Sequence, residues 1–165
     1  DYSDAVRSGK VLDPKASRRK VIGIDIDIRE HNQKAIETHP LADKIEMIQG
    51  SSIASDVINQ VRSYAKKYER VMVILDSNHT HEHVLAELDA YADLVSVGSY
   101  CCVFDTIVEN VPKELFHDRP WGPGDNPKTA VWKYLEKHPE FEIDHGIQNK
   151  LQITVVPDGY LKRVS

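Results

Sequence analysis

Two apolar runs in this chain each end at an aspartate. Residues 71–75 (VMVIL) precede Asp76, and residues 101–104 (CCVF) precede Asp105. A short, fully apolar run is typical of a strand buried on both faces of a parallel sheet, and ligands of open α/β sheets bind just past the carboxyl ends of such strands. A turn preference explains one aspartate at a strand end. Two of them, with a third acidic stretch in VIGIDID, favour a site that holds a divalent cation or a polar cofactor.

The residues around these aspartates indicate a magnesium site with a base beside it. Asp105 and Thr106 offer a carboxylate and a hydroxyl side by side. Together with Asp76 they would form an oxygen-rich site suited to Mg²⁺, which keeps several waters and needs few protein ligands. We therefore expect Asp76, Asp105 and Thr106 as metal ligands. His79 lies three residues after Asp76, and histidine is the side chain most often used as a general base, so His79 and Asp76 are the expected catalytic residues.

Three histidines alternate along this segment, at positions 79, 81 and 83. A zinc site built from them is disfavoured because the sequence offers no third soft ligand and lacks the HExxH order. His81 and His83 are instead expected on the first turns of an exposed helix.

An adenosine-type cofactor site is expected nearer the start of the chain. Asp25 follows the apolar run VIGI, where a carboxylate can accept both hydroxyls of a ribose in NAD, S-adenosylmethionine and related ligands. Of Asp25 and Asp27, one is expected only to cap the turn, and Asp25 is favoured as the ribose acid. Gly50, Ser51 and Ser52 follow the next strand and either contact an adenine edge or form a plain turn.

The elements that must position these residues alternate between strand and helix patterns. Helices are expected at 30–38, at 56–68 capped by Ser55, at 81–94 capped by Thr80, and at 127–137 capped by Asn126. Strands are expected at 20–26, 45–49, 71–75, 100–104, 141–144 and 151–156. The fold class is thus α/β, a doubly wound Rossmann-like sheet. It is mostly parallel, and it ends in an antiparallel strand because the last two strands are too close for a helical crossover.

Residues 110–126 form a long connection, rich in proline and glycine, that carries Phe116 and Trp121. Connections of this length in a compact domain are usually lids or binding loops. The two aromatic side chains either line a substrate pocket or pin the loop to the core.

The bulk properties exclude several classes of partner. The formal net charge of −5 argues against nucleic acid, and no signal peptide or apolar run of transmembrane length is present. Cys101 and Cys102 are adjacent inside an expected buried strand, so they indicate core residues in a reducing, cytoplasmic compartment. The 165 residues fit one domain, and the sequence leaves its oligomeric state open, a homo-oligomer included.

Several motifs together resemble the cephalosporin hydroxylase / rhamnosyl O-methyltransferase family, from about residue 20 to the end. They are VIGIDIDIREHN, IQGSSI, LDSNHTHEHVLAEL, FDTIVEN, RPWGPGDNP and PDGYLKRV. The resemblance implies a class I S-adenosylmethionine-dependent methyltransferase fold, with Asp25 on the cofactor ribose and residues 50–52 near adenine. It also implies that Asp76 and Asp105 hold magnesium, and that a base lies three residues after the first metal acid, at His79.

The chain departs from the family pattern in two places. Some members have an acidic pair where this chain has Phe104-Asp105, so Thr106 is the candidate to supply the second ligand. The glycine-rich first strand and turn of such methyltransferases would lie before residue 1. Residues 1–165 are therefore expected to be a single methyltransferase domain that is incomplete at its N-terminus.

The function expected from these features is magnesium-assisted methyl transfer from S-adenosylmethionine to a hydroxyl of a sugar, glycolipid or secondary metabolite. One alternative is a non-haem iron hydroxylase, which would use two histidines and one carboxylate, with His79, Asp76 and a further histidine as its candidates. The others are an NAD-dependent enzyme and a non-catalytic nucleotide-binding Rossmann domain.

Overall fold

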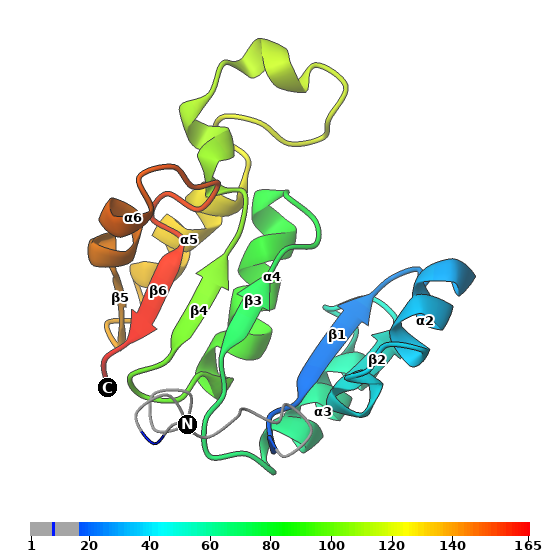
Figure 1. Ribbon diagram of the computed structural model, residues 1–165. Coiled ribbons are helices and arrows are strands. Elements are labelled where there is room, and N and C mark those ends of the chain that lie inside the picture. Colours follow the sequence, from blue (N-terminus) through cyan, green and yellow to red (C-terminus); the bar gives the residue numbers. More distant parts are fainter. Residues whose placement is uncertain (1–7, 9–16) are drawn as a thin grey trace. The chain divides into compact units, whose positions relative to one another are not determined.

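The computed structural model describes residue 8 and residues 17–165, and the chain divides into two compact units, Asp1–Ser51 and Ser52–Ser165 (Figure 1). Within the described residues, no helix combines the length and apolar character needed to cross a membrane.

The first unit contains two of the expected strands and the helix between them. β1 (Val21–Asp25) runs parallel to β2 (Ile45–Gln49), and α2 (Glu30–Glu37) connects them with the short 3-10 helix η2 (Ala42–Lys44). The backbone amide of Gly50 donates to the carbonyl of Asp25 at 2.9 Å, so the turn after β2 lies beside the end of β1. The strand and helix boundaries expected from the sequence are confirmed here to within one residue.

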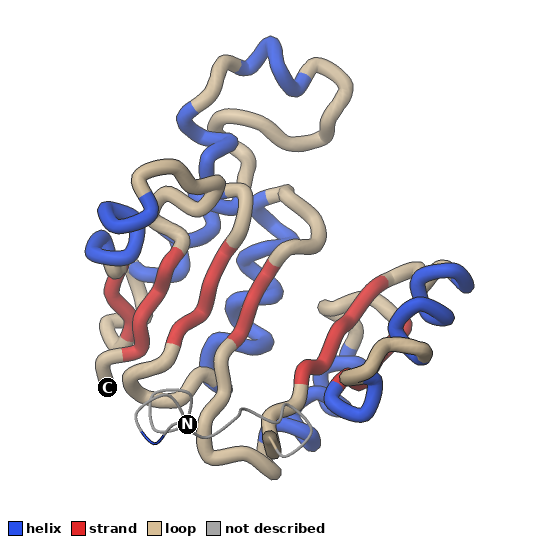
Figure 2. The backbone as a smooth tube through the Cα atoms, in the orientation of Figure 1, coloured by secondary structure: helices blue, strands red, loops and turns tan. Residues whose placement is uncertain are grey.

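The second unit is built on a four-stranded sheet with the order β3-β4-β6-β5 (Figure 2). Its strands are β3 (Val73–Leu75), β4 (Tyr100–Val103), β5 (Phe141–Ile143) and β6 (Tyr160–Arg163). β3 and β4 are parallel, whereas the C-terminal β6 runs antiparallel to both of its neighbours. The fold is therefore α/β, with parallel pairs in both units and an antiparallel C-terminal strand, as expected.

Helices α4 (His81–Tyr91) and α5 (Pro127–Leu135) pack against each other and cover one face of this sheet (Figure 1). The core between helices and sheet includes side chains with no exposed surface, and burying one such leucine contributes roughly 2 kcal/mol. Its largest fully buried apolar side chains are Leu88, Val95, Val103, Val131, Val156 and Leu161. Cys101 is also fully buried, and burial raises the pKa of its thiol.

The last predicted strand, residues 151–156, is wrong. Leu151 instead ends helix α6 (His145–Leu151), and the strand that pairs with β5 is β6, a segment where no strand was predicted. The carboxylate of Asp144 accepts hydrogen bonds from the amides of Gly146 and Ile147, so the chain turns into a helix directly after β5. Ile153 is 93% exposed, so the apolar residues of this segment do not form a buried strand.

Two predicted helix caps also differ from the structure. Ser55 is the first residue of α3 (Ser55–Ala65) rather than its cap, which is Ala54. Thr80 does occupy the N-cap of α4, but its hydroxyl donates to Oδ1 of Asn78 at 3.0 Å and does not cap the helix. The cap of α5 is confirmed: Oδ1 of Asn126 accepts from the amides of Lys128 and Thr129.

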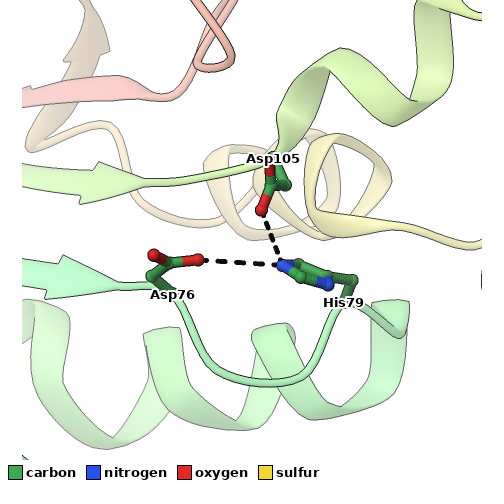
Figure 3. A group of neighbouring side chains, drawn as sticks. All are labelled: Asp76, His79 and Asp105. Atoms are coloured by element: carbon green, nitrogen blue, oxygen red, sulfur yellow. Dashed lines mark ion pairs between the residues drawn. The ribbon is translucent and has the colours of Figure 1, made fainter.

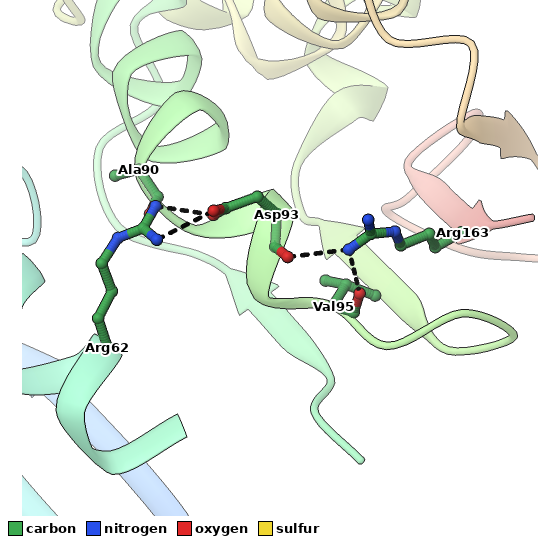
Figure 4. Close-up of polar contacts among 5 residues, drawn as sticks. All are labelled: Arg62, Ala90, Asp93, Val95 and Arg163. Carbon is green, nitrogen blue, oxygen red and sulfur yellow. Dashed lines mark hydrogen bonds and ion pairs between the residues drawn. The ribbon is translucent and has the colours of Figure 1, made fainter. Parts of the chain in front are cut away.

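Two arginines hold the segment that leads from α4 to β4 (Figure 4). Arg62 of α3 makes two bonds to the carboxylate of Asp93, at 2.9 and 2.8 Å, and one to the carbonyl of Ala90. Arg163 of β6 donates to the carbonyls of Asp93 and Val95, both at 2.8 Å. Because the Arg62–Asp93 pair is partly exposed, the pair itself contributes at most about 1 kcal/mol. These contacts hold the chain just before β4, the strand that precedes Asp105.

Candidate metal centre

Asp76, His79 and Asp105 converge at the carboxyl ends of β3 and β4 (Figure 3). Nε2 of His79 lies 2.8 Å from Oδ2 of Asp105 and 3.8 Å from Oδ1 of Asp76. One ligand atom from each residue lies within 4.8 Å of the other two. Among the described residues, this is the one group of three or more potential His, Cys, Asp or Glu ligands with such spacing. The parallel strands therefore bring together the two aspartates and the histidine that the sequence singled out.

Nε2 of His79 is buried and makes no hydrogen bond, although it lies 2.8 Å from Oδ2 of Asp105. A buried polar atom without a hydrogen bond is costly in a folded protein, so this nitrogen is suited to contact a polar ligand at the site. Two carboxylates can bind a divalent cation, and the imidazole beside them can contact a polar ligand that the cation holds. The carboxylate oxygens match what Mg²⁺ prefers.

The loop that carries Asp76 and His79 is held from α4. The hydroxyl of Ser77 donates to Oε1 of Glu87 at 2.7 Å, and the amide of Thr80 donates to Oδ1 of Asn78 at 2.9 Å. Glu87 is only 2% exposed, and its second oxygen has no partner. The buried carboxylate thus fixes the residue next to Asp76.

Sequence reasoning missed Glu87, although a signal was present. Glu87 lies in the helix sequence HEHVLAEL beside the apolar residues Val84, Leu88 and Tyr91, which form the buried face of α4. An acid within such a face is rarely buried without a purpose. Burial, together with the negative charge of Glu87, raises the pKa of Tyr91 to about 12.

Asp105 lies two residues after the end of β4, in the left-handed backbone region with φ of 53°. This conformation is uncommon outside glycine and costs about 1 kcal/mol, and aspartate tolerates it better than most residues. The amide of the preceding Phe104 donates to the carbonyl of Leu75 at 2.9 Å, which keeps the ends of β3 and β4 together. The backbone turn therefore directs the Asp105 carboxylate toward His79 (Figure 3).

The side chain of Thr106 is fully buried, and its hydroxyl has no partner. Its methyl group lies close to Gly159, at the start of β6. A ligand role for the Thr106 hydroxyl therefore stays a prediction.

His81 and His83 make contacts outside this cluster. Nδ1 of His81 lies 2.8 Å from the hydroxyl of Thr129, and Nε2 of His83 lies 3.2 Å from the hydroxyl of Ser52 and 3.5 Å from Glu87. Both histidines are partly buried, so the expectation that they start an exposed helix is wrong. Thr129 of α5 covers His81, whereas His83 lies against Ser52 and Glu87.

The residues expected at the cofactor lie at the ends of β1 and β2. Asp25 is exposed, and its Oδ1 accepts from the amide of Asp27 at 2.9 Å, so the turn is capped by Asp25 itself. Ser52 belongs to the second unit, where its carbonyl accepts from the hydroxyl of Tyr91. Cofactor roles for Asp25, Gly50, Ser51 and Ser52 stay predictions.

An α/β sheet with an antiparallel C-terminal strand, and with acids after two adjacent parallel strands, is typical of a Rossmann-like α/β protein with a ligand site at the strand ends. The chain belongs to the rhamnosyl O-methyltransferase/CmcI family, whose model matches residues 3–164.

Curated relatives agree with this family. A rhamnosyl O-methyltransferase from Mycobacterium tuberculosis is 30% identical over 118 residues, which cover 70% of this chain and 46% of that protein. The rhamnosyl O-methyltransferase of Mycobacterium leprae is 27% identical over 146 residues, which cover 87% of this chain and 59% of that protein. The chain thus spans about half the length of these relatives.

Among solved structures, the chain is similar to the MycE methyltransferase of the mycinamycin biosynthetic pathway, determined in complex with Mg and SAH. The TM-score is 0.47 and the sequence identity is 20%, over 76% of this chain and 30% of that chain.

Proposed function

We propose that this protein is an S-adenosylmethionine-dependent, magnesium-assisted O-methyltransferase that acts on a hydroxyl of a sugar, glycolipid or secondary metabolite. The observation that carries the proposal is the convergence of Asp76, His79 and Asp105 at two strand ends, in a chain of this family. The names of the curated relatives, all rhamnosyl O-methyltransferases, support a sugar hydroxyl as the acceptor.

The proposed chemistry divides the work between the carboxylates and the imidazole. Asp76 and Asp105 would hold Mg²⁺, with Thr106 as a further candidate ligand. Bound Mg²⁺ would lower the pKa of a hydroxyl on it. Nε2 of His79 would take the proton of the acceptor hydroxyl as a general base, and the hydroxyl oxygen would accept the methyl group of S-adenosylmethionine, which leaves as S-adenosylhomocysteine. The negative charge of the Asp105 carboxylate, whose Oδ2 lies 2.8 Å from Nε2, would stabilise the imidazolium that forms.

The cofactor residues, the domain and the location belong to the same proposal. Asp25 would bind the ribose hydroxyls, and Gly50, Ser51 and Ser52 would lie along the adenine. Residues 1–165 would belong to one methyltransferase domain, which the family match over residues 3–164 supports. The two free cysteines are buried, which supports action in the reducing cytoplasm.

An iron hydroxylase is not favoured by the side chains at the site. Such enzymes use two imidazoles and one carboxylate, whereas this cluster has one imidazole and two carboxylates. His81 and His83 bond to Thr129, Ser52 and Glu87 instead.

Calorimetric titration with S-adenosylhomocysteine and with MgCl₂ tests the proposal. We expect saturable heats for both ligands, and we expect Asp76→Asn to abolish the response to Mg²⁺ while S-adenosylhomocysteine still binds. Asp89→Asn is the matched control, because Asp89 is an exposed acid on α4 outside the cluster. Undiminished Mg²⁺ binding by Asp76→Asn would exclude the metal assignment, and absence of S-adenosylhomocysteine binding by the folded full-length protein would contradict the cofactor.

A further inference from the structure

We infer that Phe116 and Trp121 form an aromatic platform for the ring of the acceptor sugar, next to His79. The inference rests on the proposed function and assigns the surface that holds the acceptor. Hereafter the platform means these two side chains.

The platform lies against the proposed base. The rings of Trp121 and His79 meet edge to face, with centroids 5.0 Å apart and planes at 79°. The rings of Phe116 and Trp121 are also 5.0 Å apart, tilted by 53°. A group that rests on the platform is therefore within a few ångströms of the imidazole that would take the acceptor proton.

The exposure of the two aromatic side chains distinguishes a binding surface from residues that only anchor the loop to the core. Side chains that pin a loop to the core are buried, whereas Phe116 and Trp121 are both partly exposed and contact each other. The neighbouring Leu115 is 64% exposed. An apolar surface is thus presented beside a polar, charged cluster, which is the usual composition of a small-molecule site.

The chemistry of this surface fits a pyranose. A sugar ring has a flat face of C–H groups that packs on an aromatic ring, and a rim of hydroxyls that needs polar partners. Arg119 is one polar group nearby, because its guanidinium lies over the Trp121 ring, 5.6 Å from the ring centre. His79, whose ring also contacts Trp121, and the carboxylates of Asp76 and Asp105 would face a hydroxyl of the same sugar.

Hydrogen bonds at the base of the loop fix the platform in place. Gly122 and Asp125 exchange two backbone bonds, at 2.9 and 3.0 Å, directly after Trp121. Oε2 of Glu109 accepts from the amide of Gly124 at 2.7 Å and from the side chain of Asn126. A preordered surface of this kind loses little entropy when it binds a ligand.

The carboxylate of Asp125 ties the same loop to the metal segment. It accepts from the amide of His81 at 2.7 Å, and His81 is the first residue of α4. The platform and the loop that carries His79 are therefore fixed to the same end of one helix.

Tryptophan fluorescence tests the platform, because the chain has two tryptophans, Trp121 and Trp132. Trp132→Phe leaves Trp121 as the only tryptophan, and titration with methyl α-L-rhamnopyranoside should shift its emission saturably. Phe116→Ala in that background should weaken the apparent affinity about fivefold, the loss expected for one aromatic contact. Trp121→Phe is the matched control. Trp132, the tryptophan that remains in this variant, is an exposed residue of α5, and its emission should not change when the rhamnoside is added.

Magnesium and S-adenosylhomocysteine titrations of the same variants separate this inference from the proposed function. If both ligands bind but the Trp121 emission is unaffected by the rhamnoside, the platform is wrong and the proposed function stands. An equal response from Trp132, or from glycerol at the same concentration, also overturns the platform. A specific Trp121 response without S-adenosylhomocysteine binding by the full-length protein would support a sugar-binding surface and contradict the proposed methyltransferase activity. Circular dichroism confirms that each variant is folded.

Discussion

Asn126 is expected to stabilise the second unit far more than a helix cap usually does. The residue is fully buried, and its Oδ1 caps α5 by accepting from the amides of Lys128 and Thr129. Its Nδ2 donates to the carboxylate of Glu109 and to the carbonyl of Gly122, at 2.9 Å for the latter. Loss of the cap costs about 1 kcal/mol, and loss of a buried hydrogen bond to a charged group costs about 2 kcal/mol.

Asn126→Ala should therefore lower the free energy of unfolding of the second unit by about 3 kcal/mol. With an m-value of about 2 kcal/mol/M, the urea midpoint falls by roughly 1.5 M. Tryptophan fluorescence is the assay, because both tryptophans lie in this unit. The exposed Asn149 gives the control Asn149→Ala, which should change stability by less than about 0.5 kcal/mol.

Asn126→Asp separates the cap from the contact with Glu109. The aspartate keeps an oxygen for the helix amides but places a second carboxylate against Glu109, which raises the pKa of the pair in the folded state. A raised folded-state pKa gives stability that is present at acid pH and lost as the pH rises. The deficit of this variant should thus shrink between pH 7 and pH 5. A loss below 1 kcal/mol for Asn126→Ala, or a deficit of Asn126→Asp that does not change with pH, would refute the reasoning.

Three further results are expected. A Cβ on Gly159 would lie 2.2 Å from the carbonyl oxygen of Val103, so Gly159→Ala should lower the free energy of unfolding by at least about 2 kcal/mol; an unchanged urea midpoint would contradict this. Ser77→Ala removes the bond to Glu87 and should weaken Mg²⁺ binding about tenfold, without a matching loss of S-adenosylhomocysteine affinity, both measured by calorimetry. Because burial raises the pKa of Cys101 above its ordinary value of 9.0, the unfolded state ionises first, and stability should fall as the pH rises above 9; Cys101→Ala should flatten that part of the urea-midpoint profile against pH.

The strand ends at the site could be predicted because their signals are local. Each apolar run that stops at Asp76 or Asp105 carries its own evidence for a buried strand, and parallel pairing then brings the two acids to the same edge. His79 follows from its distance along the chain from Asp76. The N-cap of α5 could be predicted for the same reason, because Asn126-Pro127 is a local signal for the start of a helix.

The C-terminal strand could not be predicted in the same way, because its position depends on contacts between distant residues. Residues 151–156 contain more apolar residues than β6 does, so their sequence fits a buried strand better. β6 forms where it does because Gly159 can approach Val103 closely, and the Val103 amide bonds to the carbonyl of Gly159 at 2.8 Å. The burial of His81 and His83 was missed for a related reason, since their partners Thr129 and Ser52 are far away in the sequence.

The contacts around the start of α4 suggest that positioning supplies much of the proposed rate. Ser77 is fixed by the buried Glu87 on this helix, and the platform loop is fixed by Asp125 to the amide of His81. The proposed base, His79, lies between these two points in the sequence, and its ring contacts Trp121 of the platform. A sugar held on Trp121 would keep its hydroxyl at a constant distance from Nε2, which is the arrangement that converts binding energy into rate. Breaking the Asp125 contact, by Asp125→Ala, should therefore lower kcat for methyl transfer more than it weakens Mg²⁺ binding.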